Sequence, residues 1–243
     1  PVGGLARHDR RGVGGGGLVV EKVDALSNGL VDGCPPSAAG GVFVLHEAAD
    51  GVDGFAVYKV KHDWPQGWPR SVLTVRDLQA ATPQAYADLW RYVLDVDLIE
   101  RVDSWNRPAD ESLLHLLQEP RRLRATVVDN LWVRLVDLAG ALRARRYAAD
   151  GRLVLEVADP FGPWNEGRYA LEASAGEATV TAGTDAPADI ACTVNEVAAT
   201  YLGGITFRQL HRAGRIQERT DGALSRADAM FGWDPAPWSP YDY

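Results

Sequence analysis

Residues 131–147, LWVRLVDLAGALRARRY, change their hydrophobic period halfway along. Over 131–136, apolar residues recur at every second position, which is the period of a β-strand. Behind Asp137, Leu138 and Leu142 then fall at helical spacing, and an aspartate in this position caps a helix by accepting a backbone N–H. Because a strand that leads directly into a capped helix marks the start of a folding unit, we expect a domain to begin at residue 131.

Charged residues within this stretch fit the same arrangement. Arg143, Arg145 and Arg146 place positive charge near the C-terminal end of the predicted helix, where the helix dipole favours it. Arg134 and Asp137 are expected to form a structural ion pair, or a cap, at the domain boundary. The stretch is therefore predicted to join two domains.

The length of 243 residues is enough for two modest domains. Residues 42–130 alternate strand and helix patterns, which predicts an α/β unit, and residues 131–243 predict a compact α+β domain. Residues 1–41 are rich in glycine and are expected to form mostly loop. Residues 12–17 have the spacing G-x-G-x-x-G, but no predicted strand precedes them and no capped helix follows, as a dinucleotide site requires.

The first predicted domain has both strand and helix signals. We expect strands at 42–46, 55–60, 71–78 and 123–128, and helices that begin at Thr82 and Asp110. Thr82-Pro83 is a strong helix start, because threonine caps and proline costs nothing at the first helical position. The second helix is expected to stop before Pro120.

The second predicted domain is a small strand meander followed by short helices. We expect strands at 152–157, 168–173, 178–181 and 189–194, and helices capped by Asn195 and Thr206, with a third over 222–231. Alternating leucine and valine in the strands would place one apolar face under the helices. Such a domain could cover an apolar cavity.

Composition and charge narrow the class of protein. The net charge of −8 argues against a general nucleic-acid binder and is compatible with a cationic ligand. Cys34 and Cys192 are too few and too far apart for a disulfide framework, which favours a reducing cytosol. No apolar run approaches the roughly 20 residues of a membrane span. We therefore expect a cytoplasmic protein with no membrane partner.

Several catalytic motifs are missing. The five histidines are scattered without metal-ligand spacing, so no metal site is expected. Neither a G-x-S-x-G elbow nor a P-loop lysine is present, which argues against a hydrolase or a nucleotide kinase. Asp95, Asp97 and Glu100 are more typical of a solvated helix end than of an acid–base pair. Trp64 and Trp68 could stack on a ligand, but they more often plug a core edge or a subunit contact.

The C-terminal tail carries too much apolar area to stay in water. It contains Phe231, Trp233, Trp238, Tyr241 and Tyr243. Docking of the tail would carry the terminal carboxylate of Tyr243 inward, where burial raises a carboxyl pKa toward the range of a useful base. Asp242 adds a second negative charge. The tail is therefore either a catalytic or ligand-binding element or a hydrophobic staple of the second domain.

Five segments carry a resemblance to a known family. They read DGFAVYKV, TVRDLQAATPQAYADLWRYVLDVDLIERV, NLWVRLVDLAGALRARRYAADGRLVLEVAD, ATYLGG and RADAMFGWDPAPWSPYDY. They resemble the Eis (enhanced intracellular survival) family of GNAT N-acetyltransferases, and the similarity covers residues 42–243. Family members combine an acetyl-CoA-binding GNAT lobe, a second GNAT-like lobe and a domain similar to sterol carrier proteins. Residues 1–11 faintly resemble the start of the second lobe, with Gly12 in place of an expected tryptophan.

The resemblance implies a second GNAT-like lobe up to residue 130, followed by the sterol-carrier-like domain. It implies acetyl transfer from acetyl-CoA to a primary amine, of an aminoglycoside or a lysine, with the carboxylate of Tyr243 as general base. Asp242 and Trp238 would bind the acceptor. Acetyl-CoA would be bound by the first lobe, which a chain beginning at Pro1 is expected to lack, and no cofactor-binding residue is expected here. The family also implies a homo-oligomer, a hexamer.

Two other functions remain open at this point. The sterol-carrier-like domain could serve as a non-catalytic lipid or hydrophobe carrier, or the chain could mainly be an oligomerisation scaffold. Leucine and valine alternation in the strands fits all three functions equally well.

Overall fold

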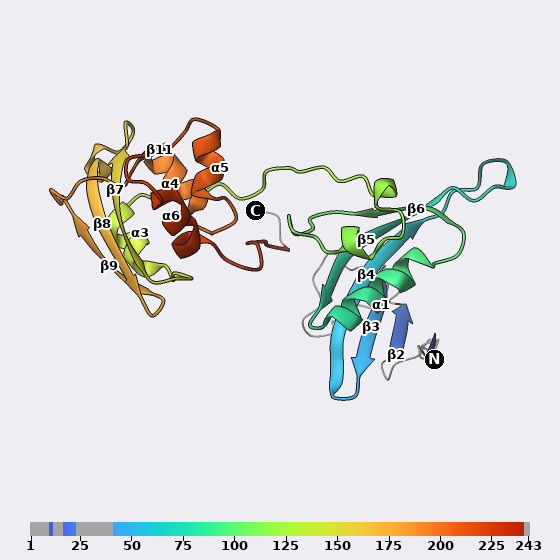
Figure 1. Cartoon of the computed structure of the whole chain (residues 1–243). Helices are drawn as coiled ribbons and strands as arrows, with labels where there is room; N and C mark the ends of the chain where they lie inside the picture. Colours follow the sequence, from blue (N-terminus) through green and yellow to red (C-terminus); the bar gives the residue numbers. More distant parts are fainter. Residues whose placement is uncertain (1–9, 12–16, 23–40, 241–243) are drawn as a thin grey trace. The chain divides into compact units, whose positions relative to one another are not determined.

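The computed structural model describes residues 10–11, 17–22 and 41–240. The chain divides into two compact units and passes from the first to the second between Ala125 and Thr126, with residues 108–110 grouped with the second. Figure 1 shows that each unit has its own sheet and its own helices. The fold is mixed α and β, as predicted.

The first unit is built on a six-stranded sheet in the order β1-β2-β3-β4-β5-β6. Its strands are Arg10–Arg11 (β1), Gly17–Lys22 (β2), Val42–Ala48 (β3), Gly51–Lys61 (β4), Ser71–Ala80 (β5) and Ile99–Ser104 (β6). Strands β1 to β5 pair antiparallel, whereas β5 and β6 are parallel because helix α1 connects them. The three strands predicted between residues 42 and 78 are confirmed.

Helix α1, Pro83–Leu94, covers one face of this sheet (Figure 1). Thr82 caps it by accepting from the Ala85 N–H, and Pro83 is at its first position, as predicted. Its buried face packs against the sheet in one apolar cluster, which includes Leu89, Trp90 and Val93. Helix α2 is only Leu113–Leu116 and is shorter than predicted, and short 3-10 turns span Pro65–Gly67 (η2) and Pro120–Arg122 (η3).

Three sequence-based assignments are wrong in this region. Residues 123–128 and 131–136 form no strand, although their residues alternate. A strand needs a neighbour to satisfy its backbone groups, and these residues pair with none in the described part of the chain, leaving Trp132 83% exposed. Strand β6 was missed because charged residues interrupt its pattern, and Glu100 lies in it rather than at a helix end.

The second unit has a five-stranded sheet in the order β11-β10-β7-β8-β9. Its strands are Gly151–Ala158 (β7), Gly167–Ser174 (β8), Glu177–Ala182 (β9), Ile190–Thr193 (β10) and Gln217–Glu218 (β11). The predicted strands are confirmed, and β7, β8 and β9 form the expected antiparallel meander. The fourth strand does not extend the meander, because β10 pairs in parallel with β7 on the other side.

Four helices complete the second unit. They are Leu138–Ala144 (α3), Val194–Thr200 (α4), Phe207–Arg212 (α5) and Ala223–Phe231 (α6), with a 3-10 turn at Pro163–Asn165 (η4). Alternate residues of β7 and β8 and the inner faces of the helices form one buried apolar cluster. Asp137 and Thr206 cap α3 and α5 as predicted, but Thr193 caps α4 in place of Asn195, because Thr193 and Glu196 form a reciprocal capping box.

A buried polar network fixes the point at which the chain enters the second unit. Asp159 is 1% exposed and accepts hydrogen bonds from Arg134 at 2.8 Å, from the Asn165 side chain at 3.0 Å and from the Gly162 N–H at 3.0 Å. Asn165 also accepts from the Leu138 N–H at 3.1 Å, at the start of α3. Arg134 therefore pairs with Asp159 and not with Asp137, whose carboxylate serves as the cap.

These hydrogen bonds, from Asn165 first and then from Arg134 and Gly162, lower the pKa of Asp159 to about 2. An unfolded aspartate titrates near 3.9, so the stabilisation by the ionised group is present above about pH 4 and is lost as the pH falls toward 2. We expect Asp159→Asn to lower the unfolding midpoint above pH 5, and the gap to the wild type to narrow between pH 4 and 2. Urea unfolding at each pH measures this. Asp185→Asn, at an exposed position, is the control, and a gap independent of pH would contradict the assignment.

Candidate functional site

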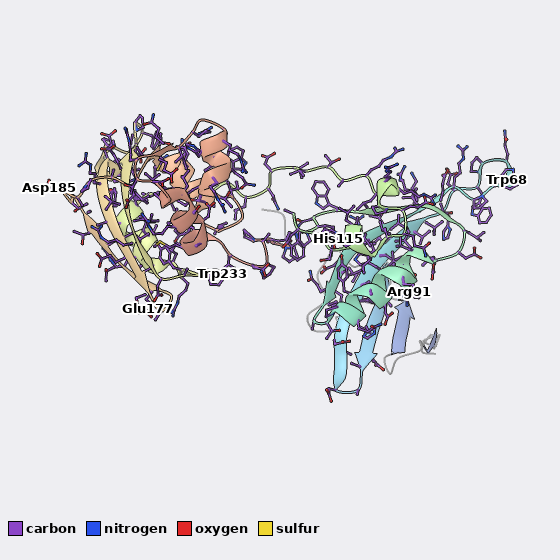
Figure 2. All side chains as sticks on the ribbon, in the orientation of Figure 1. Trp68, Arg91, His115, Glu177, Asp185 and Trp233 are labelled. Carbon is purple, nitrogen blue, oxygen red and sulfur yellow. The ribbon has the colours of Figure 1, made fainter. Side chains whose placement is uncertain are left out.

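The C-terminal tail begins where α6 ends, at Phe231, whose ring is buried. This ring packs edge-to-face against Tyr147, with centroids 5.3 Å apart, and against Phe207 at 5.0 Å. Trp233, labelled in Figure 2, follows and is 50% exposed. The first residue of the predicted aromatic cluster is therefore a core residue, and the tail leaves the core directly after it.

Two glycines after α4 let the tail lie close to the second unit. A Cβ atom on Gly203 would lie 2.8 Å from the Phe231 carbonyl oxygen and 2.9 Å from the Trp233 Cβ. Gly203 also has a φ of +91°, which disfavours any other residue. A Cβ atom on Gly204 would lie 2.9 Å from the Pro237 ring. The tail as far as Pro237 thus packs on this turn, as expected for a docked tail.

Arg145, the C-cap residue directly after α3, also contacts the start of the tail. Its Nη2 donates a hydrogen bond of 3.0 Å to the Phe231 carbonyl oxygen. Its guanidinium lies over the rings of Phe231, Tyr147 and Tyr201, with distances to the ring centroids of 4.3, 4.7 and 5.7 Å. Burial lowers the pKa of Arg145, but an arginine stays charged in proteins.

The predicted site residues lie in or beyond this tail. Trp238 is partly buried and engages in an interaction within the described chain. Asp242 and Tyr243 lie outside the described residues, so the base and the acceptor-binding roles stay predictions. Sequence reasoning missed Arg145 and Gly203 as tail contacts. Gly203-Gly204 was taken only as a helix end, and Arg145 only as a charge near the helix dipole.

The first unit has one β-α-β crossover, β5-α1-β6, among its described elements, and the N-terminus of α1 is where such a unit would hold a phosphate group. This N-terminus is occupied by the protein itself. Pro83 has no N–H, Thr82 caps the Ala85 N–H, and the Thr82 hydroxyl donates to Asp53 at 2.8 Å. Hydrogen bonds from His46 and Thr82 lower the pKa of Asp53 and keep it anionic. The pyrophosphate of acetyl-CoA does not fit here.

The remaining sequence candidates do not form a second site in the described residues. Trp64 and Trp68 are 48% and 74% exposed, so they do not plug the core of the first unit, and Figure 2 shows Trp68 on a projecting loop. Burial raises the pKa of the Cys192 thiol to about 12, which makes it a poor nucleophile. No group of three metal-ligating side chains and no helix suited to crossing a membrane occurs in the part of the chain described.

An open depression of about 470 Å³ lies on the second unit. Charged and apolar residues both line it: Glu156, Arg168, Asp185 and Arg219, with Pro187 and Ala188. Glu156 and Arg168 pair with each other across β7 and β8, at 3.1 Å. This depression is therefore a solvated surface and not the apolar cavity that the sequence left open.

We expect Gly203→Ala to destabilise the second unit by about 2–4 kcal/mol, because the new Cβ atom clashes with tail backbone and adds strain at positive φ. Gly214→Ala is the matched control, since Gly214 has a φ of +73° but open space around the new Cβ. It should cost about 1 kcal/mol from strain alone. Urea unfolding of both variants measures the difference. Equal losses would show that the tail does not press on Gly203.

Comparisons with known proteins agree with this architecture. Residues 32–135 match a family described as acetyltransferase (GNAT) domain, and residues 138–240 match one described as sterol carrier protein domain. A protein of Streptomyces avermitilis named as an uncharacterized N-acetyltransferase is 41% identical over 190 residues, covering 78% of this chain and 46% of the relative. N-acetyltransferase Eis of Mycobacterium tuberculosis is 33% identical over 195 residues, covering 79% and 45%.

A solved structure shows the same relationship. The crystal structure of Eis1 from Mycobacterium abscessus matches with a TM-score of 0.69 at 31% identity, over 84% of this chain and 50% of that one. The chain thus spans about half the length of the relatives it matches. Both domain matches follow each other along the chain in the order seen in the fold. The chain belongs to the Eis family of GNAT N-acetyltransferases.

Proposed function

We propose that the complete protein carrying this chain transfers an acetyl group from acetyl-CoA to a primary amine, on an aminoglycoside or a lysine side chain. The observation that supports this most is the succession of a GNAT domain and a sterol carrier domain, matched together by an Eis1 structure. The chain contributes the second GNAT-like lobe and the sterol-carrier-like domain, and the acceptor is a small-molecule or lysine amine.

In the proposed reaction the terminal carboxylate of Tyr243 is the general base. An ammonium has no free electron pair, so a base must take its proton before the nitrogen can attack. The nitrogen then forms a bond to the thioester carbon, the carbon–sulfur bond breaks, and the CoA thiolate leaves and takes up the second proton, which the nitrogen loses as it becomes an amide. Asp242 attracts the cationic acceptor and Trp238 offers it an apolar surface. The docking of the tail at Gly203 and Gly204 supports a fixed path for the chain toward this role.

Acetyl-CoA is proposed to bind outside the described residues of this chain. Among those residues, the N-terminus of α1 is closed by Pro83 and by the anionic Asp53, which would repel a pyrophosphate. In the sequence, the acetyl-CoA loop pattern that the family resemblance implies, Arg/Gln-x-x-Gly-x-Gly/Ala, is matched only by Arg11, Gly14 and Gly16, without the predicted strand before it and capped helix after it that such a loop needs. By family resemblance, we also propose that copies of the protein assemble into a hexamer. Its proposed location is the cytoplasm.

A carrier function is the second candidate, because the match over residues 138–240 is to a sterol carrier protein domain. The packing of the second unit argues against a large internal cavity. Phe207, Met230 and Phe231 are fully buried between the sheet and the helices and lie in one continuous apolar cluster. Organic extraction of the purified chain, followed by mass spectrometry, tests this, since a stoichiometric lipid would favour the carrier.

Removal of Tyr243 from the complete protein is expected to lower kcat for amine acetylation by about 100-fold or more, because a positioned base contributes on that order. Tyr243→Phe is the matched control, since it keeps a terminal carboxylate at the same position and should stay near wild-type activity. Steady-state kinetics with a polyamine acceptor measures both. Unchanged activity after removal would exclude the terminal carboxylate as the base.

A further inference from the structure

Arg145 holds the start of the tail from a distant part of the sequence. It lies 86 residues before Phe231, yet its Nη2 donates to the Phe231 carbonyl oxygen at 3.0 Å. This carbonyl is at the C-terminal end of α6, where unpaired oxygens and the helix dipole attract a cation. The guanidinium is therefore placed to fix the direction in which the chain leaves α6.

The surroundings of Arg145 make this placement rigid. The faces of Phe231, Tyr147 and Tyr201 surround the guanidinium, the nearest ring centroid being 4.3 Å away. Tyr147 and Tyr201 are in turn held by hydrogen bonds from their hydroxyls to the carbonyl oxygens of Leu142 and Ala141 in α3. A planar cation between three rings has little freedom to rotate.

Burying this cation is costly for stability alone. The Nη1 atom of Arg145 is buried and has no hydrogen-bond partner among the described residues, so part of its desolvation is not recovered. A leucine or methionine would fill the same apolar space without that cost. Arg143, inside α3 and two residues before Arg145, is exposed and has no such ring contacts within the described part of the chain. The partly buried charge at Arg145 therefore points to a role other than packing.

A second segment of the chain, the turn after α4, also lies close to the same carbonyl. Gly203, after α4, approaches the Phe231 oxygen so closely that a Cβ atom there would lie 2.8 Å from it, and Trp233 lies against the same glycine. Pro237 then lies against Gly204. Arg145 and this turn thus hold the tail at its origin, and a small rotation there would displace residues further along by several ångströms, because each residue spans up to about 3.3 Å.

We propose that Arg145 is a positioning residue for the acetyl-transfer reaction, which acts by aiming the C-terminal tail so that the terminal carboxylate reaches the amine. This inference rests on the proposed function. It does not make Arg145 a group that touches substrate. In this proposal the charge of Arg145 serves to orient the tail, and the second unit does not need it to fold.

The first test uses this chain alone and measures no activity. Hydrogen exchange of residues 232–240 is compared in wild type, Arg145→Met and the control Arg143→Met. We expect the amides of 232–240 to exchange at least about 10-fold faster in Arg145→Met only, while those of β7 and β8 stay protected. Arg145→Lys keeps the charge without the planar contacts and should lie between the two. Unchanged exchange over 232–240 in a folded Arg145→Met or Arg145→Lys would overturn the proposal.

The second test uses the complete protein and a double-mutant cycle. We expect Arg145→Met to lower kcat for the amine by about 10- to 100-fold, with KM for acetyl-CoA within about twofold, since misplacing a catalytic group by an ångström has effects of this size. In the protein lacking Tyr243, Arg145→Met should lower kcat by less than about twofold, because the group it aims is gone. Equal losses in both backgrounds would show a purely structural role and overturn the proposal.

The outcomes also separate this inference from the function it rests on. If removal of Tyr243 leaves activity unchanged, the terminal base is wrong, and faster exchange in Arg145→Met would then show tail anchoring without a catalytic purpose, which overturns the positioning role. If the loss in Arg145→Met depends on Tyr243 and Arg145→Lys recovers part of kcat, both proposals are supported.

Discussion

A buried carboxylate organises the entry into the second unit. Asp159 accepts hydrogen bonds from Arg134, Asn165 and the Gly162 N–H. Asn165 in turn accepts a hydrogen bond from the first amide of α3. Because a buried charge that loses a partner is strongly destabilising, these groups must assemble together. They determine where α3 begins, and Arg145 is the C-cap residue directly after its other end. The position at which the tail starts thus depends on a hydrogen-bond network at the opposite end of one short helix.

Local chemistry explains which parts of the fold were predictable. Thr82-Pro83 and Thr206 act through atoms within three or four residues, so sequence alone was enough to place these helix starts. Strand β6 and the irregular residues 131–136 depend instead on whether a partner strand is available. Residues 131–136 have the right alternation but no neighbour, and β6 has a neighbour in β5 despite a charged sequence. Pairing between distant strands overrode the local pattern in both cases.

The candidate site likewise has features that the sequence predicts and features that depend on tertiary packing. The aromatic content of the tail predicted that it would dock, because the argument needs only apolar area. The groups that receive it could not be predicted. Arg145 and Phe231 are 86 residues apart, and Gly203 matters only because the Phe231 carbonyl comes within reach of it. Contacts of this kind follow from how α3, α4 and α6 pack, and no periodicity in the sequence encodes them.

Each unit has a hydrophobic core of its own, and the two clusters of buried residues have no member in common. Damage to one core therefore leaves the apolar packing of the other intact. Variants that lose function although their substitutions lie outside the tail should then fall into two groups. In one group the first unit unfolds, and in the other the second unit unfolds. Trp90 is 2% exposed in the core of the first unit, so loss of that core brings its indole into water. A ligand that raises only the unfolding transition of the first unit would be located to that unit before any complex is solved.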